Sequence, residues 1–287
     1  MVINSPMIEK LINWSLEHYA HLPWRKNRDI YTTLVSEIML QQTTVSTVLN
    51  HFSKFIEKYP DIKSLAKISE EQILIDWKGL GYYRRAKNLL SAAKYIDQYY
   101  EGNIPLEFDK LKNIKGIGDY TANAILSIGA NKKAISVDAN IERVLARMYG
   151  LDIVKGPKLQ KDIYAKFYAG EICQEIDNYG ARDYNEALMD LGRSICKAKS
   201  AYCELCPLST ICVAFTKGIP LAYPREDQQK KLVTEKSFDL KLLRIIIRDQ
   251  EKIFVYKKKP HQWLAGQYEI PTLIISSEDD TLKQYPQ

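Results

Sequence analysis

Apolar residues recur at helical spacing along the first two thirds of the chain. Ser5 offers an N-cap with Pro6 at the first helical position, and apolar side chains then follow every three or four residues. Ser69 is followed three residues later by Gln72, which is the spacing of a capping box at a helix start. The pattern predicts a mainly helical chain, with helices over 5–19, 69–77, 89–96 and 184–196.

The pattern changes after Cys212. Glycine, proline and charged residues there are typical of a linker, and short apolar or β-branched runs follow it. Asp249-Gln250-Glu251 separates two of these runs and predicts a hairpin. Strands are expected over 240–247, 253–256 and 270–275.

The length is typical of about two domains, at roughly 150 residues per domain. We expect a core over 1–218, a linker over 219–235 and a C-terminal region over 236–287. The last of these is small for an independent hydrophobic core.

Charge and hydropathy exclude little. The net charge of +6 permits contact with nucleic acid without arguing for it. No apolar run approaches the roughly 20 residues of a membrane helix. Charged residues such as Glu9 and Lys10 interrupt the N-terminal apolar pattern, so we expect no secretory signal and a cytoplasmic, nucleoid-associated location.

Four cysteines lie close together, separated by six, two and five residues: Cys196, Cys203, Cys206 and Cys212. In a reducing compartment such a group predicts a metal site before it predicts disulfides. Four thiolates suit one zinc ion or one iron–sulfur cluster, and the ligand count does not decide between them.

Two glycines separated by one residue, Gly116 and Gly118, lie between predicted helices. They allow backbone N–H groups to point outward, and a helix starting at Tyr120 or Thr121 adds its positive dipole end. This arrangement predicts a phosphate-binding hairpin, and an ordinary helix–helix turn is the alternative.

Two acidic residues complete the candidate chemistry. Glu37 lies in an apolar helical stretch, and Asp138 comes about twenty residues after the hairpin. Taken singly, Glu37 suits a solvent-facing helix residue and Asp138 suits a helix N-cap.

These motifs together resemble the MutY family of adenine DNA glycosylases. Glu37–Thr43, Gly79–Tyr83, the hairpin, Asp138 with Asn140, and the cysteine loop match in order, over roughly residues 20 to 212. The resemblance implies a mainly α, two-lobed helix-hairpin-helix DNA glycosylase with a [4Fe–4S] loop and a short, partial α/β (MutT-like) C-terminal segment. It places a six-helix lobe at about 26–132 and an iron–sulfur lobe at 1–25 and 133–218.

The resemblance also implies roles for the matching residues. Glu37 protonates adenine, Asp138 stabilises the sugar cation or traps it covalently, and Tyr120 and Asn140 assist near the sugar. This chemistry needs an acid at the departing base and a carboxylate facing the oxocarbenium-like sugar. The implied base pocket is Trp24, Arg25, Leu40 and Glu186. The implied DNA contacts are Gln42, Tyr82, Gly116, Gly118 and Thr121. The implied cluster ligands are Cys196, Cys203, Cys206 and Cys212. Alternatively, Trp24 and Tyr82 are core residues and Arg25 and Glu186 are surface residues.

Three departures from the family pattern shape the expected activity. Bifunctional relatives carry a Schiff-base lysine where this chain has Tyr120, so we expect little or no strand cleavage. Ala139 replaces the usual glycine, as in archaeal thymine glycosylases. The C-terminal region is short and has no Phe-Ser-His loop, which predicts weaker discrimination of 8-oxoguanine.

We expect a base-excision enzyme that acts as a monomer on double-stranded DNA containing adenine mispaired with 8-oxoguanine or guanine, without contact with a membrane. One alternative is a mismatch-specific thymine or uracil glycosylase of the same superfamily. A second alternative is a catalytically weak protein that binds DNA lesions.

Overall fold

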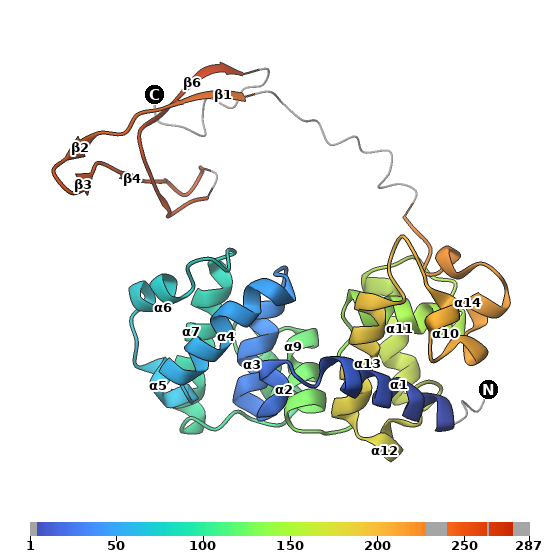
Figure 1. Ribbon diagram of the computed structural model, residues 1–287. Coiled ribbons are helices and arrows are strands. Elements are labelled where there is room, and N and C mark those ends of the chain that lie inside the picture. The colour runs from blue at the N-terminus through green and yellow to red at the C-terminus, as the bar shows by residue number, and fades with distance from the viewer. Residues whose placement is uncertain (1–4, 228–239, 263, 278–287) are drawn as a thin grey trace. The chain divides into compact units, whose positions relative to one another are not determined.

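The computed structural model describes residues 5–227, 240–262 and 264–277. The chain divides into two units, Met1–Asp227 and Gln228–Gln287 (Figure 1). The first unit is helical, which confirms the predicted mainly helical class. No helix in the described part of the chain is long and apolar enough to cross a membrane.

The first unit consists of two lobes, each with its own hydrophobic core. The first lobe contains α2 (Pro23–Lys26), α3 (Ile30–Leu40), α4 (Val45–Lys58), α5 (Ile62–Ala66), α6 (Glu70–Asp76), α7 (Arg84–Tyr100), α8 (Phe108–Lys112), α9 (Asp119–Ala124) and the π-helical turn η1 (Ile125–Gly129). The second contains α1 (Ser5–Tyr19), α10 (Ala139–Tyr149), α11 (Pro157–Tyr168), α12 (Ile176–Tyr179), α13 (Ala181–Ser194), α14 (Val213–Thr216) and three short 3₁₀ turns, η2 (Cys203–Leu205), η3 (Ser209–Ile211) and η4 (Pro220–Ala222).

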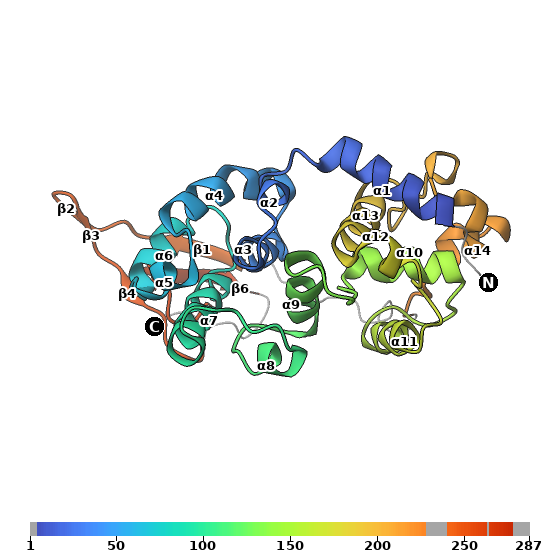
Figure 2. The ribbon, with the colours of Figure 1, turned by 90° about the horizontal axis from the view of Figure 1, so that it is seen from below.

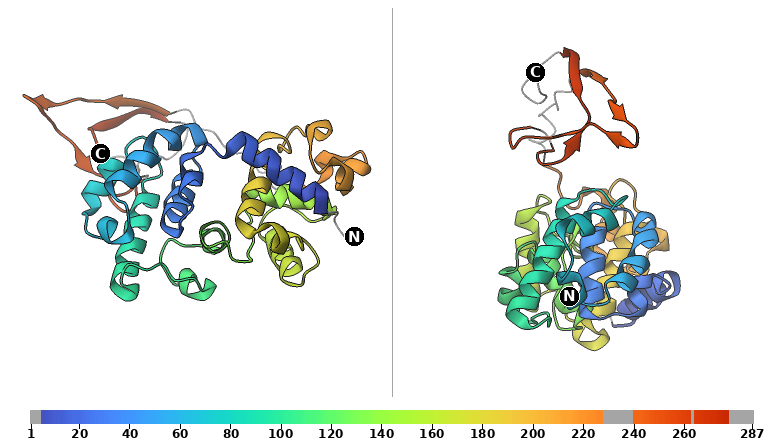
Figure 3. Two further views of the ribbon diagram at one scale, coloured as in Figure 1. Left: turned by 60° about the horizontal axis from the view of Figure 1, so that its bottom comes forward. Right: turned by 90° about the vertical axis from the view of Figure 1, so that its left-hand side faces the viewer.

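The N-terminal helix belongs to the second lobe although it begins the chain. Ile8 and Leu11 of α1 are fully buried in the second core, and α1 lies along α13 (Figure 2). Leu22 and Trp24 already pack in the first core, so the chain changes lobe a few residues before position 25. The chain therefore passes between the lobes twice, once after α1 and again after η1 (Figure 3, left).

Capping side chains start several helices where the sequence predicts them. Ser69 accepts a hydrogen bond from the backbone N–H of Gln72 at the start of α6. The Gln72 side chain donates to Asp76 instead of returning to Ser69, so the expected capping box is only half formed. The helix expected over 184–196 runs three residues earlier at its start, from Ala181 to Ser194.

The first unit extends beyond the expected core boundary at 218. The turn η4 follows that position, and the backbone of Arg225 then exchanges hydrogen bonds with Ile153 and Lys155. The side chain of Arg225 also pairs with Asp152 at 2.9 Å. The residues from 219 to 227 are therefore attached to the second lobe, because their backbone groups find partners there.

The described residues of the second unit form antiparallel pairs of strands and no helix. The strands are β1 (Leu240–Arg244), β2 (Arg248–Asp249), β3 (Lys252–Ile253), β4 (Tyr256–Lys257), β5 (Tyr268–Glu269) and β6 (Thr272–Ser277). The expected hairpin is present as β2–β3, with Gln250 left-handed at φ 52°. The expected strand over 270–275 corresponds to β6, which pairs with β1.

Candidate active site

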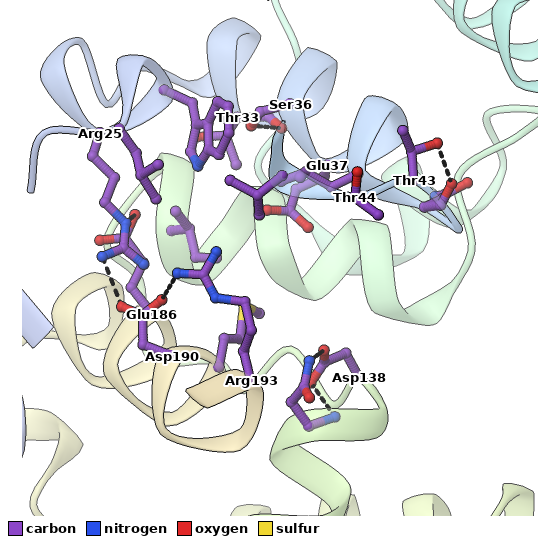
Figure 4. Close-up of a pocket in the computed structure, with 18 of the residues that line it drawn as sticks. Arg25, Thr33, Ser36, Glu37, Thr43, Thr44, Asp138, Glu186, Asp190 and Arg193 are labelled. Atoms are coloured by element: carbon purple, nitrogen blue, oxygen red, sulfur yellow. Dashed lines mark hydrogen bonds and ion pairs between the residues drawn. The ribbon is translucent and has the colours of Figure 1, made fainter. Parts of the chain in front are cut away.

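A cavity of about 800 Å³ lies in the first unit and is lined from both lobes. Glu37 and Asp138 project into it from opposite walls (Figure 4). The sequence-predicted residues that line this cavity are Trp24, Arg25, Glu37, Leu40, Gln42, Tyr120, Asp138, Asn140 and Glu186. The four other predicted DNA contacts lie outside its lining: Tyr82, Gly116, Gly118 and Thr121.

Glu37 is a buried acid on a helix that is buried nearly all round. Nine consecutive residues of α3, Tyr31–Met39, are buried, and Glu37 itself is 7% exposed. Burial raises its pKa from 4.5 to about 7, because removing water disfavours the charged form, while a hydrogen bond from Tyr120 opposes that rise. Glu37 is thus poised to hold or release a proton near neutral pH.

Tyr120 is the second residue of α9, and its side chain contacts Glu37. Its hydroxyl donates a hydrogen bond to Glu37 Oε2. Burial and the facing carboxylates raise the pKa of Tyr120 well above its usual range, so the phenol stays protonated. The carboxyl of Glu37 therefore has one oxygen held by a fixed donor and a second oxygen available to the cavity.

Asp138 is the N-cap of α10. Its Oδ1 accepts from the backbone N–H groups of Asn140 and Ile141 at 2.9 and 2.7 Å, and its Oδ2 accepts from Asn140 Nδ2 at 2.8 Å. Burial raises its pKa, and these three hydrogen bonds act in the opposite direction by stabilising the charged form. Asp138 can therefore cap α10 and face the cavity at the same time.

Arg25 and Glu186 are buried rather than on the surface. Arg25 Nε lies 3.5 Å from Glu186 Oε1, and Arg25 Nη1 lies 2.8 Å from Asp190 Oδ2. Arg28 adds a second contact to Glu186 at 3.1 Å. Ser15 of α1 donates to Asp190 at 2.6 Å, so this ion network joins α1, α2 and α13 at the cavity wall.

Trp24 and Tyr82 differ in their surroundings. Trp24 is both a pocket residue and a core residue, because it lines the cavity and also packs edge-on against Phe52 in the first core. Tyr82 is 61% exposed, so it is not a core residue. Tyr82 and Gln42 are both exposed residues with left-handed backbones, at φ 44° and 54°.

The hairpin between α8 and α9 has the tight turn that the glycines predict. Gly116 has φ 95°, and a Cβ there would lie 2.7 Å from Cβ of Asn88. Gly118 is the N-cap of α9 and has open space beside it. Thr121 is only 2% exposed, and its hydroxyl accepts from Gln41 at 3.4 Å, so its side chain faces the first lobe.

Sequence reasoning missed two charged cavity residues on α13. Asp190 holds Arg25, and Arg193 pairs with Asp190 at 3.0 Å while its guanidinium lies 4.4 Å above the ring of Tyr19. Glu186, Asp190 and Arg193 are spaced four and three residues apart, which places them on one helix face. Once Glu186 had been assigned to the pocket, this spacing could have predicted that Asp190 and Arg193 face the same cavity.

The four clustered cysteines line one small second cavity beside Arg147. Arg147 Nη1 lies 3.2 Å from Cys196 Sγ. Across the described residues, no three Cys, His, Asp or Glu side chains are arranged to hold a single metal ion. Four thiols around one cavity are the donor set that a four-thiolate iron–sulfur cluster uses.

The chain is similar to known DNA repair proteins. Residues 35–168 match the HhH-GPD superfamily of base excision DNA repair proteins, and Glu37, Tyr120 and Asp138 lie inside that segment. An adenine DNA glycosylase of Buchnera aphidicola subsp. Acyrthosiphon pisum (strain APS) is 37% identical over 254 residues, which is 88% of this chain and 69% of that protein. An adenine DNA glycosylase of Homo sapiens is 33% identical over 213 residues, covering 71% of this chain and 38% of that protein.

A solved structure supports the fold. A thermostable thymine-DNA glycosylase superposes with a TM-score of 0.62 at 27% sequence identity, covering 74% of this chain and 96% of that one. The helical unit described above accordingly has the architecture of a known glycosylase.

Proposed function

Because the chain belongs to the adenine DNA glycosylase family, within the HhH-GPD superfamily of base excision DNA repair proteins, we propose that it hydrolyses the N-glycosidic bond of mispaired adenine in double-stranded DNA. The expected opposing base is 8-oxoguanine or guanine. One observation carries the proposal: Glu37, whose pKa is raised to about 7, and Asp138, whose carboxyl group accepts hydrogen bonds, line the same cavity.

Glu37 serves as the general acid. Removing a base leaves negative charge on its ring, so a proton must arrive as the bond breaks. A carboxyl group with a pKa of about 7 is half protonated at neutral pH and can supply that proton. Tyr120 orients the group by holding Oε2, which leaves Oε1 for the base.

Asp138 serves on the sugar side. Breaking the glycosidic bond builds positive charge on the sugar, and a carboxylate on the facing wall stabilises it. Asn140 fixes the carboxylate through its side-chain amide. Because the N–H groups at the start of α10 favour the ionised form, Asp138 can stay charged beside a buried acid.

The base must leave the duplex to reach the cavity. Trp24, Leu40 and the Arg25–Glu186 pair form the wall that receives it, and Gln42 and Tyr82 are the side chains that enter the stack. The hairpin at Gly116 and Gly118 binds a phosphate through its backbone. The protein acts as a monomer on DNA.

The four cysteines that line the second cavity would hold a [4Fe–4S] cluster. Its binding would cross-link the chain between Cys196 and Cys212 and stabilise the second lobe. The catalytic residues act without it taking part in the reaction.

A panel of duplexes tests the substrate. Adenine should be released from A·8-oxoguanine and A·G, with no release of thymine or uracil from T·G and U·G. Release from T·G alone would contradict the adenine assignment and favour the thymine alternative. Turnover that disappears in Glu37→Gln and Asp138→Asn would exclude the alternative of a protein that only binds lesions.

The absence of lyase activity is tested separately. Tyr120 cannot form a Schiff base with the sugar, so borohydride should trap no covalent protein–DNA adduct. An adduct formed in the same yield as base release would contradict the monofunctional assignment.

A further inference from the structure

We propose that Arg85 is a positioning residue that holds two exposed turns, at Gln42 and Tyr82, at one fixed spacing for base extrusion. The inference rests on the proposed function, because the resemblance assigns these two side chains to the base stack. It concerns the first turn of α7, which lies outside the catalytic cavity lining.

Arg85 binds the first turn through the end of α3. The residue is 7% exposed, and its Nη1 donates to the carbonyl oxygens of Ile38 at 2.9 Å, Met39 at 2.8 Å and Gln41. The last carbonyls of a helix have no partner within the helix, so a buried guanidinium satisfies them. Arg85 thereby fixes the backbone immediately before Gln42.

The other nitrogen of the same guanidinium binds the second turn. Nη2 donates to the carbonyl oxygens of Leu80 at 3.0 Å and Gly81 at 3.3 Å. It also donates to Thr43 Oγ1 at 2.8 Å, on the far side of the first turn. The ring of Tyr82 lies 5.5 Å from the guanidinium carbon. A single planar group therefore contacts the residues on both sides of Gln42 and the two residues before Tyr82.

The two turns need such support. Gln42 and Tyr82 both have φ values in the left-handed region, which non-glycine residues adopt only when their surroundings hold them there. Both side chains are exposed, so burial in the core does not fix either turn. A side chain that enters the base stack must stay in place against the displaced bases, so the backbone of its turn has to be fixed by contacts on its protein side.

Lysine cannot replace Arg85 in this role. An ammonium group is a compact point donor, whereas the guanidinium presents two nitrogens at a fixed separation, one for each turn. Arg84 precedes it on α7 and is exposed, so it offers a matched control. Arg85→Lys and Arg84→Lys both retain the charge, and a difference between them reports the two-nitrogen geometry rather than attraction to phosphate.

Two measurements test the proposal. Hydrogen exchange of the free protein is followed in the segments 39–44 and 79–85. Base extrusion is followed by the fluorescence of 2-aminopurine, placed at the target position opposite guanine, in a Glu37→Gln background that keeps the base attached. Arg85→Lys should speed exchange in both segments together and lower the extrusion equilibrium at least tenfold. Arg84→Lys should leave both within twofold.

Unchanged exchange, exchange that rises in one segment only, or undiminished extrusion would each overturn the proposal. If Arg85→Lys does not fold, Thr43→Val removes one acceptor of the guanidinium and should speed exchange in both segments about threefold; no change there overturns the proposal equally. A wild-type protein that removes no adenine would contradict the proposed function. The hydrogen-exchange measurement would still decide whether Arg85 holds the two turns.

Discussion

Replacing Tyr120 by phenylalanine should move the alkaline limb of the pH–rate profile to higher pH. The substitution removes the hydroxyl that donates to Glu37 Oε2, and that hydrogen bond lowers the pKa of Glu37 by stabilising its charged form. Glu37 acts as an acid, so the protonated form is active and the rate falls as the pH rises through its pKa. In the wild-type protein this limb should lie at about pH 7.

The size of the movement follows from the geometry. A hydrogen bond to a charged group contributes about 1.5–3 kcal/mol, and one pKa unit corresponds to about 1.4 kcal/mol. Loss of the Tyr120 hydroxyl should therefore raise the pKa of Glu37 by about one to two units. Burial of Glu37 and the nearby Asp138 act in the same direction and remain in place.

The assay is single-turnover release of adenine from an A·G duplex between about pH 5.5 and 9.5, a range that brackets the pKa of Glu37 and the expected rise. Tyr168→Phe is the matched control, because it removes the same hydroxyl from an exposed tyrosine on α11 that does not line the cavity. A limb that stays in place in Tyr120→Phe, or that moves to lower pH, would refute the assignment of Glu37 as the proton donor oriented by Tyr120.

Three further outcomes are expected. The folded-state pKa of Glu37 is raised, so the contribution of Glu37 to stability is complete below about pH 4.5 and is lost as the pH rises through about 7. In urea titrations, the free energy of unfolding of Glu37→Gln should therefore exceed that of the wild type by up to about 3 kcal/mol at pH 8 and should match it at pH 4.5. Asp138→Asn should keep the melting temperature, because asparagine also caps helices, yet lower the single-turnover rate about 100-fold or more; an unaltered rate would remove Asp138 from the mechanism. Cys206→Ser should lose bound iron and melt at lower temperature, and stoichiometric zinc without iron in the wild-type protein would contradict the iron–sulfur assignment.

Local signals in the sequence were sufficient for several helices and for the local setting of Glu37 and Asp138, whereas the pairing of the two acids came from the resemblance. The N-cap alternative for Asp138 is confirmed, because that geometry depends only on the next few backbone N–H groups. Glu37 was expected in an apolar helix, and the helix is buried on nearly all sides. The half-formed capping box shows the limit of such signals, since Gln72 had a second partner one turn ahead at Asp76.

Contacts between distant segments could not be read from the sequence. Arg25 and Glu186 were suspected, but their ion network also includes Asp190, on the same helix α13 as Glu186, and Ser15 of the distant helix α1. Arg85 carried no local signal, because its six partners are backbone carbonyls and one hydroxyl brought together by the fold. The raised pKa of Glu37 depends on burial that only the packed structure defines.

The ion pairs along the cavity wall have a consequence for what can enter it. They pair Glu186 and Asp190 with arginines, whereas none of the ion pairs between described residues involves Glu37 or Asp138. An ionised Asp138 at the cavity wall therefore disfavours a phosphate group beside it and tolerates an uncharged base, so the polarity of the lining contributes to selecting what the cavity holds.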